Sequence, residues 1–82
     1  MAETLKQLFI IKAVNKKTGA IKYVEIDDDD CVNLVKHNSD ATLYRKYEAA
    51  EQAMKKYCES EAINTFTVES IIMSLKEMMT EH

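Results

Sequence analysis

The chain has 82 residues, of which 46% are hydrophobic and 30% charged, and its net charge is −3. This length allows one domain (residues 1–82) with a small core, and the composition is that of a globular chain and not of a disordered one. No apolar run approaches the roughly 20 residues that a membrane-spanning helix requires, and the sequence starts without an apolar signal segment, so we expect a cytoplasmic protein without membrane insertion.

The charge is unevenly distributed along the chain. Residues 1–24 contain five lysines and one glutamate, whereas residues 25–82 contain six basic and thirteen acidic residues. The two parts therefore carry charges of +4 and −7. Two solvated faces would explain this asymmetry, and a molecule that orients on a charged partner is the alternative.

Residues 7–26 are predicted to form a β-hairpin. Two apolar, β-branched runs (8–14 and 20–26) flank the sequence Asn15-Lys16-Lys17-Thr18-Gly19. The Asn15 side chain can bond the backbone of the turn, and Gly19, the only glycine, can take the positive φ that closes it. Lys16 and Lys17 then lie in the turn, where they are candidates for binding an acidic partner or phosphates.

Four consecutive aspartates, 27–30, follow the hairpin. Carboxylates bind hard cations, but an EF-hand loop needs glycine at its sixth position and glutamate at its twelfth. Counted from Asp27, these positions are Val32 and Asn38. We therefore expect a solvated turn or an acidic helix start and no bound metal. For residues 27–39, a short helix and a long loop both fit.

Residues 40–59 are predicted to form an amphipathic helix. Its apolar stripe recurs at steps of three and four and consists of Leu43, Tyr47, Ala50, Met54 and Tyr57. Ser39 or Asp40 can cap its start. In the alternative, residues 41–44 form a short strand and the helix begins near Lys46. Cys58 lies beside the stripe and is expected in the core.

Residues 64–81 combine two patterns. Residues 64–68 alternate like a strand, whereas the apolar residues from Val68 onward fit helical spacing. We expect a short extended segment that leads into a helix capped by Thr67. Met73, Met78 and Met79 are candidates for partner binding because flexible methionines suit adaptable surfaces, although packing within the monomer is favoured. A homodimer or a partner helix would cover apolar surface that the small core leaves exposed.

No group of residues has the pattern of a catalytic or metal site. Cys31 and His37 are six positions apart, and His82 ends the sequence. Two cysteines and two histidines match no zinc-ligand spacing and lack the group that orients a catalytic Cys–His pair. We predict two reduced cysteines, no cofactor and no enzymatic activity.

The arrangement resembles small accessory proteins encoded by bacteriophages. The resemblance covers residues 8–57 and rests on the lysine-rich hairpin, the acidic connection and the segment Ala41-Thr42-Leu43-Tyr44-Arg45-Lys46-Tyr47-Glu48-Ala49-Ala50. The chain is also similar in size to the cytoplasmic lysis-inhibition protein of T-even phages. The resemblance implies a protein of the host cytoplasm that binds and modulates a host or phage protein, and it assigns no functional residue.

These observations predict an α+β fold, in which an N-terminal β-hairpin packs against one long amphipathic helix and a C-terminal strand, helix or both follow. The leading functional hypothesis is a non-enzymatic, protein-binding regulator or inhibitor. The alternative is a nucleic-acid-binding accessory protein that uses the basic hairpin. It is less favoured because the net charge is negative and Arg45 is the only arginine, the residue on which base recognition usually depends.

Overall fold

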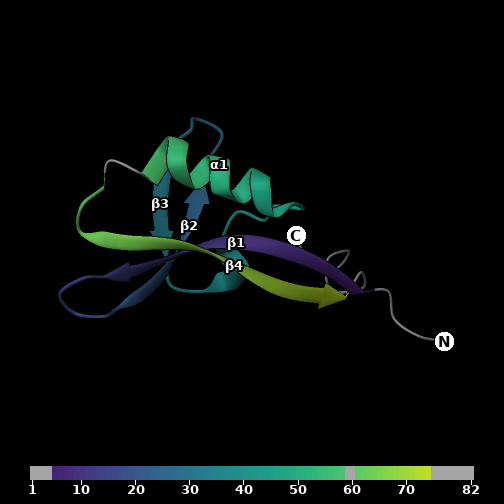
Figure 1. Ribbon diagram of the computed structural model, residues 1–82, viewed down its shortest axis with the longest axis horizontal. Helices are drawn as coiled ribbons and strands as arrows, with labels where there is room; N and C mark the ends of the chain where they lie inside the picture. Colours follow the sequence, from purple (N-terminus) through teal and green to yellow (C-terminus); the bar gives the residue numbers. More distant parts are fainter. Residues whose placement is uncertain (1–4, 59–60, 75–82) are drawn as a thin grey trace.

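The computed structural model describes residues 5–58 and 61–74, without the side chains of Leu5, Met73 and Ser74. Within these residues the chain forms a four-stranded antiparallel sheet and one α-helix (Figure 1). The elements in chain order are β1 (Leu5–Asn15), β2 (Ile21–Ile26), β3 (Val32–Val35), a short 3₁₀ helix (Asn38–Asp40), α1 (Tyr47–Cys58) and β4 (Asn64–Ser74). The strand order is β3-β2-β1-β4. The predicted α+β fold is confirmed.

β1 is a central strand and carries the core on both of its faces. It pairs with β2 on one side and with β4 on the other. Leu8, Ile10, Ile11 and Ala13 are all buried, although successive residues of a strand point to opposite faces. A continuous apolar run such as 8–11 is typical of a strand that is covered on both faces.

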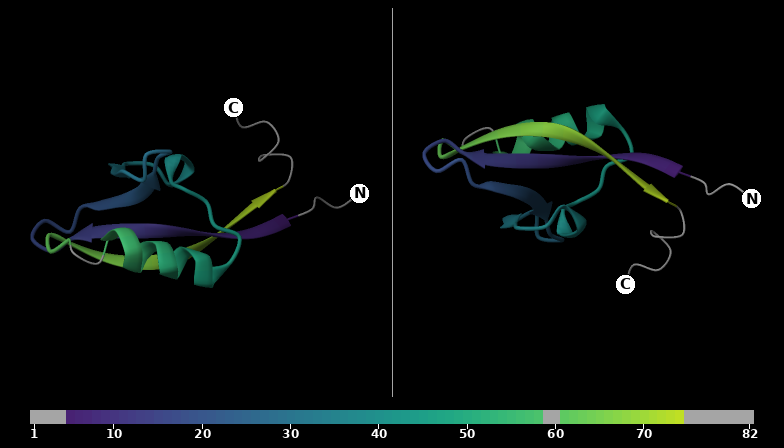
Figure 2. Two further views of the ribbon diagram at one scale, coloured as in Figure 1. Left: turned by 90° about the horizontal axis from the view of Figure 1, so that it is seen from above. Right: turned by 90° about the horizontal axis from the view of Figure 1, so that it is seen from below.

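α1 lies against one face of the sheet, where it packs on β1 and β4 (Figure 2). Its alanine-rich sequence favours a helix. Glu48 in the first turn and Lys55 and Lys56 in the last turn complement the helix dipole. Cys58 is buried against Ile11 and Val24, so its predicted place in the core is confirmed. The side chains that surround this cluster are Ile26, Tyr44, Ala53, Met54, Tyr57 and Phe66.

The helix begins later than the leading prediction placed it. α1 starts at Tyr47, and Ser39 and Asp40 belong to the 3₁₀ helix, too far away to cap it. Leu43, which was predicted in the apolar stripe, precedes the helix and is exposed. The alternative is correct in its later helix start, but residues 41–44 are an extended segment in which Tyr44 forms an isolated bridge with Phe9, not the short strand that it predicted.

The extended segment forms because it finds backbone partners on two strands. The amides of Phe9 and Tyr44 each donate to the other's carbonyl, at 2.8 and 2.9 Å. The Thr42 amide donates to the Val24 carbonyl at 3.1 Å, and Thr42 Oγ1 accepts from the Ile26 amide at 2.7 Å. These tertiary hydrogen bonds outweigh the helical pattern of the local sequence.

The turn between β1 and β2 has the predicted chemistry. Asn15 Oδ1 accepts from the amides of Lys17 and Thr18 at 2.8 and 3.0 Å. The Gly19 amide donates to the Asn15 carbonyl at 2.8 Å, and the φ angle of Gly19 is +73°. The predicted hairpin and the special role of its glycine are confirmed.

The aspartate run forms the turn between β2 and β3. Asp27 Oδ1 accepts from the amides of Asp29 and Cys31, both at 2.9 Å, and Asp30 has a positive φ of 61°. These hydrogen bonds favour the charged form of Asp27 and lower its pKa. All four aspartates are exposed, which confirms the solvated turn.

For residues 27–39, the predicted short helix and the predicted long loop are both wrong, because a strand forms inside this range. Residues Val32–Val35 form β3 and pair with β2, from Tyr23↔Val35 to Ile26↔Val32. The compact aspartate turn returns the chain directly along β2, so residues 32–35 complete the ladder hydrogen bonds of that strand.

Residues 68–74 also form a strand where a helix was predicted, while residues 75–81 of that predicted helix lie outside the described residues. β4 runs to Ser74 and pairs with β1 without interruption, from Asn15↔Asn64 to Leu5↔Ser74. Thr67 lies inside this strand and caps no helix. Its β-branched neighbours suit a pleated strand, and β1 offers it a partner of equal length, so pairing outweighs the helical spacing.

Candidate functional site

The predicted site residues fall into two groups, and the structure describes the side chains of only one of them. Lys16 and Lys17 lie in the β1–β2 turn, and both are exposed. Met73 lies in β4 by its backbone, while its side chain is outside the described residues, as are Met78 and Met79. The methionine surface therefore stays a prediction, and the lysine-bearing turn is the part of the predicted site that has a described geometry.

The fold places the start of β4 beside this turn. The Lys16 amide donates to the Ile63 carbonyl at 3.0 Å. A surface pocket here is lined by Asn15, Lys16, Lys17, Thr18, Ala62 and Ile63. Because Ile63 is 63% exposed, it presents an apolar side chain among the turn residues. We call Lys16, Lys17, Thr18, Ala62 and Ile63 the tip surface.

Ile63 is held outward by a small hydrogen-bonded loop. The Glu61 carboxylate accepts from Asn64 Nδ2 at 2.6 Å and from the Ile63 amide. These hydrogen bonds, assisted by the nearby Lys16 charge, lower the pKa of Glu61 and keep it ionised at neutral pH. The loop is thus anchored through its polar groups, while the Ile63 side chain stays exposed.

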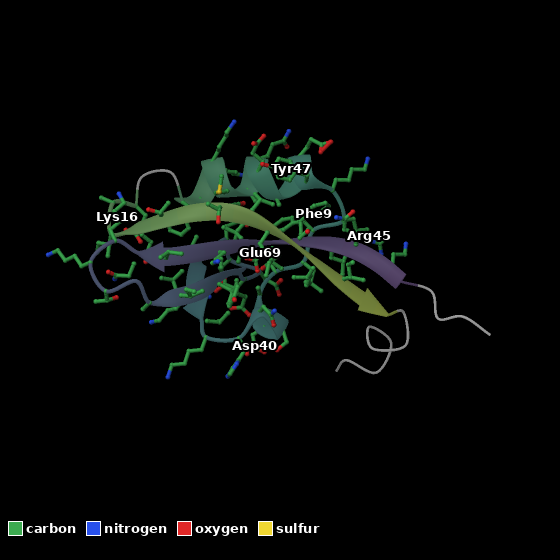
Figure 3. The ribbon with its side chains drawn as sticks, turned by 60° about the horizontal axis from the view of Figure 1, so that its bottom comes forward. Phe9, Lys16, Asp40, Arg45, Tyr47 and Glu69 are labelled. Atoms are coloured by element: carbon green, nitrogen blue, oxygen red, sulfur yellow. The ribbon has the colours of Figure 1, made fainter. Side chains whose placement is uncertain are left out.

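The tip surface is electropositive around its apolar centre. Lys16 and Lys17 belong to it, and Lys22 lines an adjoining pocket together with Ile63. Glu61, which lines the same adjoining pocket, supplies one opposing charge. Figure 3 shows Lys16 at one end of the sheet and Arg45 toward the other. An apolar side chain with cationic neighbours matches a ligand that carries both carboxylates and an apolar group.

The cysteines and the histidine of the described residues do not come together in one site. The described residues include no cluster of three or more histidine, cysteine, aspartate or glutamate side chains that could hold a metal ion. Cys31 and His37 flank the two ends of β3, so a strand of about 13 Å separates them. Burial raises the pKa of the Cys58 thiol, which opposes formation of the nucleophilic thiolate.

Comparison with models of known protein families, with curated proteins and with solved structures found no match. The resemblance to phage accessory proteins therefore stays a prediction. Among the helices of the described residues, none has the length and apolar character to cross a membrane.

The lysines of the tip surface were predicted from the sequence, but Ile63 and Glu61 were not. Ile63 stands between Ala62 and Asn64, outside any apolar periodicity. The hydrogen bond between Lys16 and Ile63, next to the Asn15↔Asn64 pair of β1 and β4, joins positions far apart in the chain and makes them one surface.

Proposed function

We propose that this protein is a small, non-enzymatic regulator or inhibitor that binds an acidic segment of a partner protein through its tip surface. The observation that carries the proposal is the exposed Ile63 side chain, which lies beside Lys16 and Lys17 in one pocket lining. Protein interfaces combine an apolar centre with a polar rim. From the resemblance to phage accessory proteins, we further propose that the partner is a host or phage protein.

The two kinds of residue contribute differently to such binding. Exposed lysines form ion pairs that are worth about 0–1 kcal/mol each, and their main effect is faster association with an acidic partner. Full burial of an isoleucine side chain is worth about 1.5–3 kcal/mol. Since Ile63 still exposes 63% of its surface, covering it would contribute about 1–2 kcal/mol, or roughly a 5–30-fold change in Kd.

Nucleic acid is the second candidate, because the hairpin lysines could contact phosphates. The tip surface favours protein for two reasons. An apolar side chain at its centre gains nothing from a phosphate backbone, and the ionised Glu61 beside it repels one. The arginine that base recognition would use, Arg45, lies in the segment before α1, away from Lys16 (Figure 3).

The test is a quantitative affinity capture with matched variants. The bait proteins are the wild type, the double variant Lys16→Glu with Lys17→Glu, and the control Lys55→Glu with Lys56→Glu on α1. The proposal predicts a protein that the wild type and the α1 control retain and that the tip variant loses, with binding that weakens as salt rises. Equal retention by the tip variant and the control contradicts the tip surface as the binding site.

A parallel titration with single-stranded and duplex oligonucleotides tests the second candidate. The proposal predicts only weak, non-specific binding, with a Kd of about 10⁻⁴–10⁻⁶ M at physiological salt. Tighter binding that the Lys16→Glu, Lys17→Glu variant abolishes would replace the protein-binding proposal with the nucleic-acid one.

A further inference from the structure

β4 presents one unpaired edge in the described part of the chain. The sheet order places it last, beside β1 only. Phe9 exchanges both of its backbone hydrogen bonds with Tyr44, so its polar groups point away from β4. Hydrogen bonding alternates along an antiparallel strand, and Phe9 is opposite Ser70. Ser70 therefore directs its amide and carbonyl away from β1, toward the open edge. The same holds for the residues two and four positions from it in β4, which are Phe66, Val68 and Ile72.

This edge lacks the features that normally prevent strand pairing. Natural edge strands carry lysine, proline or a bulge. Residues 65–72 contain no lysine and no proline, and the register with β1 is continuous. Their one charged side chain, Glu69, pairs with Lys12 at 3.4 Å on the neighbouring strand. Ile72 is 68% exposed.

We propose that the β4 edge pairs with the β4 edge of a second copy of this chain, which joins two sheets into one. Two identical edges pair in antiparallel fashion about a two-fold axis perpendicular to the sheet, so residues on the same face oppose each other. The neutral, β-branched character of the edge matches the same edge in another copy, because neither strand brings an unpaired charge to the contact.

The side chains select a register centred on Ser70. In this register Val68 of each copy lies opposite Ile72 of the other and covers its exposed side chain, while the two Ser70 hydroxyls meet at the axis. The three residue pairs form about six backbone hydrogen bonds. A register centred on Glu69 places two carboxylates opposite each other, which is destabilising. One centred on Val68 places Ile72 opposite the polar Asn64.

The position of α1 is compatible with this register. The Tyr47 ring contacts the Phe9 ring edge-to-face at 5.9 Å, and Phe9 is opposite Ser70. From there α1 extends to Cys58, which packs in the cluster that includes Phe66. The C-terminal end of β4 continues past the helix (Figure 1). Each helix therefore begins near Ser70 and extends toward Phe66, so two-fold symmetry about Ser70 directs the two helices away from the axis in opposite directions.

The test measures self-association by sedimentation equilibrium over a range of protein concentrations. Wild type and the control Ser70→Thr should form dimers, and Ser70→Lys should weaken the dimer at least tenfold because two lysines oppose each other at the axis. An equimolar mixture of Ser70→Lys and Ser70→Glu should form the dimer again, since the pair at the axis is then complementary.

A monomeric wild type, or Ser70→Lys dimers as stable as wild type, overturns the inference. A mixture of the charged variants that stays monomeric overturns the Ser70 register. Circular dichroism verifies that each variant is folded, and Ile72→Lys replaces Ser70→Lys if that variant is unfolded, because Ile72 is already largely exposed. Substitutions of Lys16 and Lys17 should leave the dimer unchanged, so this test is independent of the proposed function.

Discussion

Replacing Gly19 tests the turn that positions the tip surface. Its φ of +73° lies in the left-handed region, and a Cβ atom added there would meet nothing within 4 Å. The cost of Gly19→Val is therefore a backbone cost without a steric clash, about 1–2 kcal/mol for a residue with a side chain. For a domain of this size, each kcal/mol lowers the Tm by roughly 4–8 °C.

Urea unfolding at 25 °C and thermal melts, both followed by circular dichroism, measure this effect. Gly19→Asn should cost less than Gly19→Val, because asparagine tolerates the left-handed region. Lys17→Val, in the same exposed turn at a residue with negative φ, should change stability by less than about 0.5 kcal/mol. If Gly19→Val is neutral, or if it costs no more than Lys17→Val, the reasoning about this turn is refuted.

Further expectations concern pH, thiol reactivity and one partly buried hydrogen bond. The pKa of Asp27 in the folded protein is below its ordinary value of 3.8. The ionised carboxylate therefore stabilises the fold above pH 3.8, and this stabilisation is lost as pH falls through the lowered pKa. Asp27→Asn should make the decline of Tm below about pH 4 shallower. Iodoacetamide followed by mass spectrometry should modify the exposed Cys31 in the native protein and leave the buried Cys58 unmodified, whereas equal labelling would contradict the core position of Cys58. Thr42→Val leaves the Ile26 amide without its acceptor and should cost about 1–3 kcal/mol in urea unfolding, while a neutral result would show that this hydrogen bond is replaced.

The β1–β2 hairpin could be predicted because its determinants are local. Asn15 and Gly19 specify the turn through bonds and a φ angle within a few residues, and the flanking runs 8–14 and 20–26 are β-branched. The burial of Cys58 followed from its place beside the helical stripe. Both features depend on residues that are close together in the chain, so they can be predicted from the sequence alone.

β4 could not be predicted beyond its first residues, because the deciding interaction is long-range. Val68, Ile71 and Ile72 satisfy helical spacing as well as strand propensity. Pairing with β1, whose partner residues lie 49 to 69 positions away in sequence, decides between them. β3 was missed for a related reason, since its formation depends on the open edge of β2.

Only part of the tip surface could be predicted from the sequence. Lys16 and Lys17 were identified because charged residues in a predicted turn must be exposed. Ile63 was not, since its exposure results from the hydrogen bonds of Glu61 and from the contact of its own carbonyl with the Lys16 amide. The tip surface therefore depends on the tertiary contact between Lys16 and Ile63, which the local sequence does not indicate.

The affinity of the captured partner for two isoleucine variants tests the proposed binding surface most directly. Ile63→Ser removes the apolar centre of the tip surface, and Ile21→Ser removes an isoleucine on β2 that is 49% exposed and outside that surface. Titration calorimetry should give a Kd for Ile63→Ser that is roughly 5–30-fold weaker than wild type, with Ile21→Ser unchanged. Equal Kd values for the two variants would contradict binding through the tip surface.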